Sequence, residues 1–262
     1  MLNTTSNKVS LAGLHRYLPK DVRKLIYAKL DKYDVKLILK AHGSKEPILT
    51  VELSNHCVKK GRLELLKWAI DNGCKLSVNS SYIAAMNGHL EVLKYLYAIG
   101  CSWDASDCKY AAENGHIEVL KYLRANGCPW DTRAYIYAAK NGHLEVLKYL
   151  HANGCPWNEL ACAYAANNGR LEVLKYLHDN NCPWDTSACS NAARYGHLEV
   201  LKYLHENGCP WDVYTCAFAA VGGHLEALIW ILANGCPWDK SECIRHATRN
   251  NHQHIIDWLN AN

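Results

Sequence analysis

Phenylalanine and methionine are scarce in this sequence, which has one phenylalanine and two methionines among 262 residues. It also lacks any stretch approaching the roughly 20 apolar residues that span a bilayer. Residues 1–20 contain no apolar run long enough for a secretory signal. We therefore predict a cytoplasmic protein without membrane segments, whose core consists of leucine, valine, alanine and cysteine in thin layers.

Catalytic motifs are also lacking. The sequence contains no HExxH, GxSxG, P-loop or GxGxxG pattern, and no two cysteines have CxxC spacing. Five histidines have a glutamate two positions later, as in part of the zinc deaminase signature, but the PCxxC that completes that signature is absent. These are His89, His116, His143, His197 and His224, and Arg170 stands at the equivalent position of one further copy. We predict that these histidines hydrogen-bond across a turn or to the next layer. We predict no enzyme, and no catalytic, cofactor-binding or metal-binding residue.

The sequence does contain one short module, repeated at a period of 27 residues. Seven glycines mark this period: Gly61, Gly88, Gly115, Gly142, Gly169, Gly196 and Gly223. A constant period in this range is typical of a solenoid, in which each unit contacts only its neighbours and the surface serves as a platform for other molecules.

Each copy has the pattern of two short helices. A capping residue is expected at the start of the first helix, where its side chain can accept from free backbone amides. These residues are Asp104, Asp131, Asn158, Asp185, Asp212 and Asp239. Asp239 and Glu242 have the spacing of a capping box. Small residues such as Cys108, Ala111 and Ala112 follow at helical spacing, which allows two helices to approach closely.

The second helix of a copy is expected over segments such as 117–126. Ile117, Leu120 and Leu123 lie one turn apart and form its apolar face. Glycines such as Gly115 supply the left-handed backbone that ends the first helix, and in the last copy, where the period fails, Asn251 takes this place.

The recurring strings AAxNGHLEVLKYL and NGC resemble ankyrin repeats, over roughly residues 50–262. An ankyrin repeat has about 33 residues and a TPLH tetrapeptide. Here about six residues are missing before the first helix, where ankyrin proteins build a β-hairpin, and the form is similar to the short repeats abundant in giant viruses of amoebae. A leucine-rich repeat also tolerates this period, but Leu90, Leu93 and Leu96 have helical rather than strand spacing. The resemblance implies an all-α, ankyrin-like helical solenoid of about eight stacked helix-turn-helix repeats, with the β-hairpin fingers shortened or absent.

Two columns of cysteine follow the period. The first comprises Cys74, Cys101, Cys128, Cys155, Cys182, Cys209 and Cys236, and the second Cys108, Cys162, Cys189, Cys216 and Cys243. Neighbours in one column are expected one layer apart, about 10 Å for packed helices, whereas a disulfide needs Cα atoms within about 7 Å. We therefore expect buried free thiols.

Tryptophan also forms a column, which could be a stacking platform for bases or carbohydrate but is better explained by packing, because tryptophan stabilises most when buried. The column comprises Trp103, Trp130, Trp157, Trp184, Trp211 and Trp238.

Residues that vary from copy to copy are free from the demands of stacking, so we look for the binding site among them. A rotation of 100° per residue places them on the face of the first helix opposite its small residues. The ankyrin resemblance implies that this face lines a concave groove. The predicted partner-binding residues are Lys109, Tyr110, Glu113, Arg133, Tyr137, Lys140, Tyr164, Asn167, Asn191, Arg194, Tyr214, Phe218 and Val221. Tyrosines beside mixed charges are typical of protein interfaces, so we predict a monomeric scaffold that binds a protein.

Charge argues against nucleic acid as the partner. Residues 51–262 contain 19 Lys or Arg against 21 Asp or Glu, a net charge of −2, so the array has no basic stripe for phosphates. Residues 1–50 contain 10 against 4, a net charge of +6.

The segment 1–49 precedes the period and is expected to form a basic helical module of its own. Its string LPKDVRKLIYAKLDKYDVKLIL resembles the front half of an F-box, which implies docking of residues 18–40 to Skp1 and a role as a ubiquitin-ligase adaptor. A helical cap over the first repeat is the alternative, because terminal repeats must shield an apolar layer. Residues 252–259 are the expected C-terminal cap.

Overall fold

A computed structural model describes residues 51–71 and 73–262, in which the chain forms sixteen α-helices and no strand. The segment 1–49 lies outside the described residues, so its cap and F-box interpretations stay predictions. The contacts divide the chain into two units, with the boundary after Ser80. We describe each unit by itself.

The described part of the first unit holds one helix pair, α4 (Val51–Lys60) and α5 (Leu63–Asp71). Leu53 of α4 and Leu66 of α5 are buried where the two helices pack. The hydroxyl of Ser54 donates to the carbonyl of Lys75 at 2.7 Å, which ties the chain after α5 back to α4.

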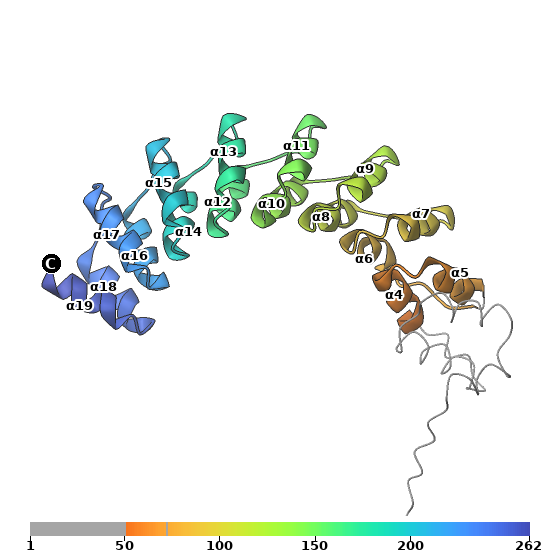
Figure 1. Cartoon of the computed structure of the whole chain (residues 1–262), viewed down its shortest axis with the longest axis horizontal. Coiled ribbons are helices and arrows are strands. Elements are labelled where there is room, and N and C mark those ends of the chain that lie inside the picture. The colour runs from red at the N-terminus through yellow and green to blue at the C-terminus, as the bar shows by residue number, and fades with distance from the viewer. Residues whose placement is uncertain (1–50, 72) are drawn as a thin grey trace, which may run out of the picture. The chain divides into compact units, whose positions relative to one another are not determined.

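The second unit contains seven helix pairs of the same kind, so the described residues contain the eight repeats that the sequence predicts. First helices line the inner side of the row and second helices the outer side (Figure 1). First helices contact the first helices of neighbouring repeats extensively. The helices are α6 (Ser80–Met86), α7 (Leu90–Ala98), α8 (Ala105–Glu113), α9 (Ile117–Ala125), α10 (Thr132–Asn141), α11 (Leu144–Ala152), α12 (Glu159–Asn167), α13 (Leu171–Asp179), α14 (Thr186–Arg194), α15 (Leu198–Glu206), α16 (Val213–Gly222), α17 (Leu225–Ala233), α18 (Lys240–Arg249) and α19 (Gln253–Ala261).

The predicted caps begin most of the first helices. Five of the six residues accept a hydrogen bond from a backbone amide, and Asn158 alone does not. Reciprocal capping boxes join Asp104 to Asp107, and Asp212 to Thr215. The capping box expected at Asp239 is only half formed, because the carboxylate of Glu242 is bound by Arg245 instead.

Left-handed residues end the helices as predicted. Gly115 has φ +75°, and Asn251 takes the same conformation with φ +60°. Asn181, at φ +63°, is a second asparagine in a glycine position, which we did not predict.

The apolar layers consist of small residues from first helices and leucines from second helices. Cys108, Ala111 and Ala112 are fully buried, as expected. In α9 the buried face is Val119, Leu120 and Leu123, whereas Ile117 is only half-buried. The predicted face was therefore wrong at one position, because Ile117 is the first residue of its helix and lies at the end of the layer.

All thirteen cysteines are free thiols, and all except the half-buried Cys101 are buried. The two columns nevertheless contact one another, which reasoning along a single column missed. The Cys189 thiol lies 3.9 Å from the carbonyl oxygen of Cys209, twenty residues further on. The adjacent Cys108 thiol and burial both raise the pKa of Cys128. A thiol held in this protonated form is a poor nucleophile, so Cys128 acts as a small core residue.

The tryptophan column packs against other rings, as predicted. Trp103 stacks on Tyr97 and Trp184 on His178, each with ring centroids 4.2 Å apart. In each case the partner lies six positions earlier in the sequence. Trp238 departs from the pattern and is 41% exposed, since the residue six positions before it is the aliphatic Leu232.

No helix in residues 51–71 or 73–262 combines the length and the apolar character that crossing a bilayer requires.

Candidate partner-binding face

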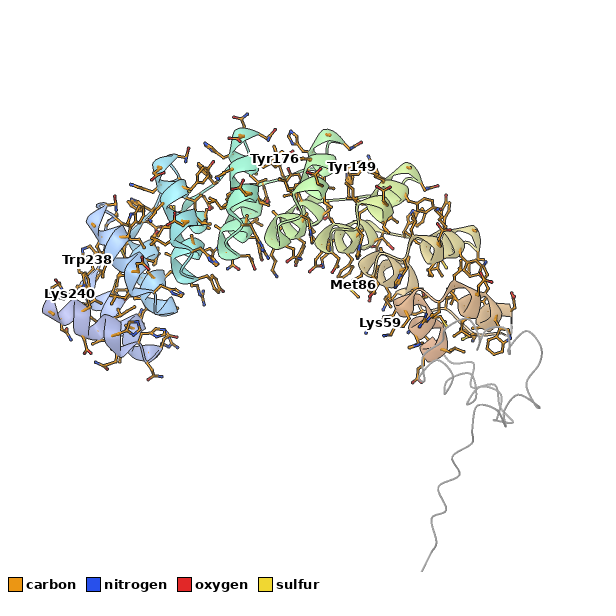
Figure 2. The ribbon with its side chains drawn as sticks, viewed as in Figure 1. Lys59, Met86, Tyr149, Tyr176, Trp238 and Lys240 are labelled. Carbon is orange, nitrogen blue, oxygen red and sulfur yellow. The ribbon has the colours of Figure 1, made fainter. Side chains whose placement is uncertain are left out.

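The predicted binding residues belong to the first helices, whose side chains line the inner side of the second unit. Figure 2 shows Met86 of α6 at this side, whereas Tyr149 and Tyr176 of the second helices lie toward the outer side. Small residues pack the opposite side of each first helix against the second helices, and this leaves the variable residues on the open side.

Five predicted residues form a closed cluster on α8 and α10. The ammonium of Lys109 lies 4.0 Å from the ring centroid of Tyr110 and 4.4 Å from that of Tyr137. It also lies 3.9 Å from the Glu113 carboxylate. Lys140 approaches Tyr137 from α10, at 5.8 Å. The charges of this cluster are thus already engaged by its own aromatic rings and carboxylate.

Six other predicted residues line a single hollow of about 640 Å³ between α12, α14 and α16. We call it the inner hollow. Its predicted members are Tyr164, Asn167, Asn191, Arg194, Tyr214 and Phe218, and it is also lined by Leu160, Ala163, Thr186, Ser187, Ser190, Tyr195 and Asp212.

Arg194 is the cation of the inner hollow. Its guanidinium lies 5.5 Å from the Phe218 ring and 5.8 Å from the Tyr195 ring. It forms no ion pair within the described part of the chain. The nearby Asp212 carboxylate instead caps α16, where it accepts from the Tyr214 amide at 3.0 Å. The hollow therefore offers an aromatic-backed guanidinium that an acidic group can still reach.

Arg133 and Val221 belong to neither group. The guanidinium of Arg133 donates three hydrogen bonds to the Asp131 carboxylate, at 2.7 to 3.1 Å, and these bonds lower the pKa of Asp131. The backbone carbonyl of Val221 accepts from His252 at 3.0 Å. The structure thus gives both residues local roles.

Two large residues of the inner hollow escaped prediction. Tyr195 is 47% exposed and Leu160 is 41% exposed. The repeat carried a signal for both. Tyr195 interrupts a column that holds asparagine in four earlier copies, and Leu160 stands in the column of Arg133 and Tyr214. The prediction took Arg133 and Tyr214 from the column of Leu160 but not Leu160 itself, and it took no residue from the column of Tyr195.

His116, His143 and His197 link neighbouring repeats, which confirms the predicted role for these three histidines. The His143 ring bonds to the carbonyl of Glu113 at 3.0 Å, and the His197 ring bonds to that of Asn167 at 3.1 Å. Arg170 makes the same link, donating to the Lys140 carbonyl at 3.2 Å. These side chains therefore hold the first helices that carry the binding face.

We expect acidification to lower the stability of the fold, because it protonates the histidines that link neighbouring repeats. Burial lowers the pKa of His116 and His224, and the neighbouring histidines lower both further. Because unfolded histidine titrates at about 6.5, the unfolded chain binds more protons just below that pH. Stability should thus be complete above about pH 6.5 and fall as the pH drops. The urea midpoint should be lower at pH 5.5 than at pH 7.5, and a midpoint that rises on acidification would contradict this. The variant His116→Gln/His224→Gln keeps amide donors for the carbonyls and should show a weaker pH dependence.

Comparison with known proteins places the chain in a family. The family profile described as ankyrin repeats (3 copies) matches residues 54–134, 108–187 and 135–215. Among solved structures, the crystal structure of the human ASB11 ankyrin repeat domain is similar, with 22% sequence identity and a TM-score of 0.51. That match covers 60% of this chain and 84% of the other, and at this identity it bears on the fold alone. No curated protein sequence matches the chain.

Proposed function

The chain belongs to the ankyrin-repeat family, and on that basis we propose that it is a non-enzymatic scaffold that binds a protein through the inner face of its first helices. Ankyrin repeats are generally protein-interaction modules, and the array of residues 50–262 would act as a monomer. The inner hollow is the proposed centre of the interface. Given the similarity of these short repeats to those of giant viruses, we propose a host protein as the partner and the host cytoplasm as the location.

One observation carries this proposal. Six residues chosen because they vary between copies and lie on the open face of the first helices line the same hollow. Tyr164 and Tyr214 expose 38% and 60% of their surface there, beside an arginine without an ion-pair partner in the described residues. Exposed tyrosine and arginine in a concave site are the residue types that supply most binding energy at protein interfaces.

The charge of the array also favours a protein over nucleic acid. The inner hollow holds one guanidinium, which has no ion-pair partner among residues 51–71 and 73–262. The lysines of the closed cluster are engaged by Tyr110, Tyr137 and Glu113. A phosphate backbone needs several accessible cations in a row. A protein segment with an acidic residue and apolar neighbours suits the same site better.

The test is a triple substitution on the inner face, Tyr137→Ala/Tyr164→Ala/Arg194→Ala. We expect the proteins captured from a lysate by the native chain to fall at least about tenfold with this variant, since loss of an aromatic or arginine anchor often exceeds about 1.4 kcal/mol. Quantitative mass spectrometry measures the capture, and circular dichroism checks the fold.

The matched control removes three exposed side chains from the outer side, Lys121→Ala/Lys148→Ala/Lys175→Ala. It should capture the same proteins as the native chain. Capture that persists in the inner-face variant would place the interface elsewhere.

A second candidate rests on the string that resembles an F-box. We propose residues 1–49 as a separate module, in which residues 18–40 dock Skp1 while the array selects the substrate of a ubiquitin ligase. Co-purification with the full chain and with a chain lacking residues 1–45 tests this. Skp1 and cullin should accompany only the full chain, and their absence from both would remove the adaptor role.

A further inference from the structure

The outer side of the second helices carries an ion pair that recurs with the period. In each case a glutamate in the first turn accepts from a lysine three residues later, with nitrogen to oxygen distances of 2.7 to 2.9 Å. The pairs are Glu64–Lys67, Glu91–Lys94, Glu118–Lys121, Glu145–Lys148, Glu172–Lys175 and Glu199–Lys202. Such pairs keep the outer side polar and contribute little to stability.

Helix α17 breaks this pattern. It keeps the glutamate, Glu226, but holds Ile229 where six other second helices have lysine. Ile229 is 39% exposed. The next residue, Trp230, replaces the tyrosine of the preceding five copies. Leu232 likewise stands where the three preceding copies have histidine, so α17 gives up two polar residues for aliphatic ones. An exposed aliphatic residue in place of a lysine points to a local role.

The substitution lies in a hollow of about 610 Å³ between α15 and α17. We call it the outer hollow. Leu198, Leu225, Ile229 and Trp230 supply most of its apolar wall. Because it lies on second helices, it is separate from the inner hollow on α12, α14 and α16.

One ammonium and one carboxylate line the outer hollow, and of the two only the ammonium has an ion-pair partner among the described residues. Lys202 and Glu226 both line it, but the Lys202 ammonium is bound to Glu199 at 2.7 Å. In six other second helices the glutamate equivalent to Glu226 is paired with the lysine three residues later. Glu226 forms no ion pair with any residue the structure describes.

We propose that the outer hollow is a second binding site, which takes a short helical segment of a protein with an apolar side chain and a lysine or arginine one helical turn apart. The apolar side chain covers Ile229 and Trp230, and the cation replaces the lysine that α17 lacks by pairing with Glu226. The array then holds two segments at once, one on each side. This site does not depend on the inner hollow.

The experiment uses the full chain and two fluorescent, amidated, alanine-based peptides. One carries leucine and lysine one helical turn apart, and the other carries leucine and glutamate at the same positions. Fluorescence anisotropy measures affinity, and the Ile229 methyl resonance of isotope-labelled protein locates the peptide, with the buried Ile136 as reference.

We expect the leucine–lysine peptide to bind at least about tenfold more tightly than the leucine–glutamate peptide and to shift the Ile229 methyl signal. Glu226→Gln should remove most of that preference, and Ile229→Ser should weaken binding of both peptides. Glu172→Gln changes the net charge equally but lies on α13, so it should leave binding unchanged.

Three results would overturn the proposal. These are equal affinity for the two peptides, an unmoved Ile229 signal at saturation, and an equal effect of Glu172→Gln and Glu226→Gln. An Ile229 signal that shifts with protein concentration alone would instead identify a second copy of this chain as the occupant, and would overturn it too.

Discussion

Replacement of Gly115 by alanine is expected to lower the free energy of unfolding by about 3 kcal/mol. Its φ of +75° costs an L-residue about 1 to 2 kcal/mol. A Cβ atom there would also lie 2.7 Å from Nδ1 of His143, too close for any real contact. The ring must then move from the position in which it bonds the Glu113 carbonyl at 3.0 Å. Crowding of this kind adds about 1 to 3 kcal/mol.

Gly127 is the matched control for this prediction. It has nearly the same conformation, φ +79°, but a Cβ atom there would meet nothing within 4 Å. Gly127→Ala should therefore cost only the conformational part, about 1 kcal/mol. Urea unfolding followed by circular dichroism compares the two variants. If both variants lose the same free energy of unfolding, the close approach of His143 to Gly115 adds nothing to the cost of the substitution.

The substitution Leu147→Ala is expected to have an effect of similar size, again about 3 kcal/mol. Leu147 is fully buried in α11, which packs against α10 of its own repeat and α13 of the next. Loss of the side chain removes apolar burial and leaves a cavity that short, tightly packed helices fill poorly; such substitutions cost about 2 to 5 kcal/mol. Because neighbouring repeats stabilise each other, a central defect weakens the layers on both sides.

The adjacent Lys148→Ala variant controls for the change to alanine in the same helix. Lys148 is exposed and forms only the outer ion pair with Glu145, so its loss should cost less than about 0.5 kcal/mol. Chemical denaturation of both variants at one pH provides the comparison. A loss below about 1 kcal/mol for Leu147→Ala would contradict the tight packing described for this layer.

Features that recur could be predicted from the sequence because each copy supports the others. The helix ends at Gly115 and Asn251, and the buried Cys108, Ala111 and Ala112, are found where expected. The repetition makes a weak local signal strong, since one pattern appears in many copies. A single nonrepeating helix with the same residues would not have allowed such assignments.

Contacts between columns could not be predicted in this way. The approach of Cys189 to Cys209 depends on where the end of a second helix meets the first helix of its own repeat. Periodicity alone gives the order of residues along a column, not the distance between columns. The sequence also did not predict that Arg170 makes the same hydrogen bond as the histidines. This depends on the length of its side chain and the position of its Nε donor, not on the residue type.

The candidate site was predicted in part. Variation between copies identified the open side of the first helices, and six of the chosen residues line the inner hollow. Variation does not reveal which charges are already neutralised, so the bound Arg133 and the free Arg194 seemed alike. Attention to first helices also left Ile229 unnoticed, although it breaks the most regular ion pair in the sequence.

The link made by Arg170 divides the array into two electrostatic blocks. Besides burial, His89 and His143 lower the pKa of His116 in one block, and His197 and His252 lower the pKa of His224 in the other. Acidification therefore protonates the histidines of the two blocks independently. The hydrogen bond from Arg170 to the Lys140 carbonyl persists while the histidine links within either block weaken. In an acidified array, the layers that Arg170 links should therefore stay together while the layers linked by histidine loosen on either side. The blocks are His89, His116 and His143, and His197, His224 and His252.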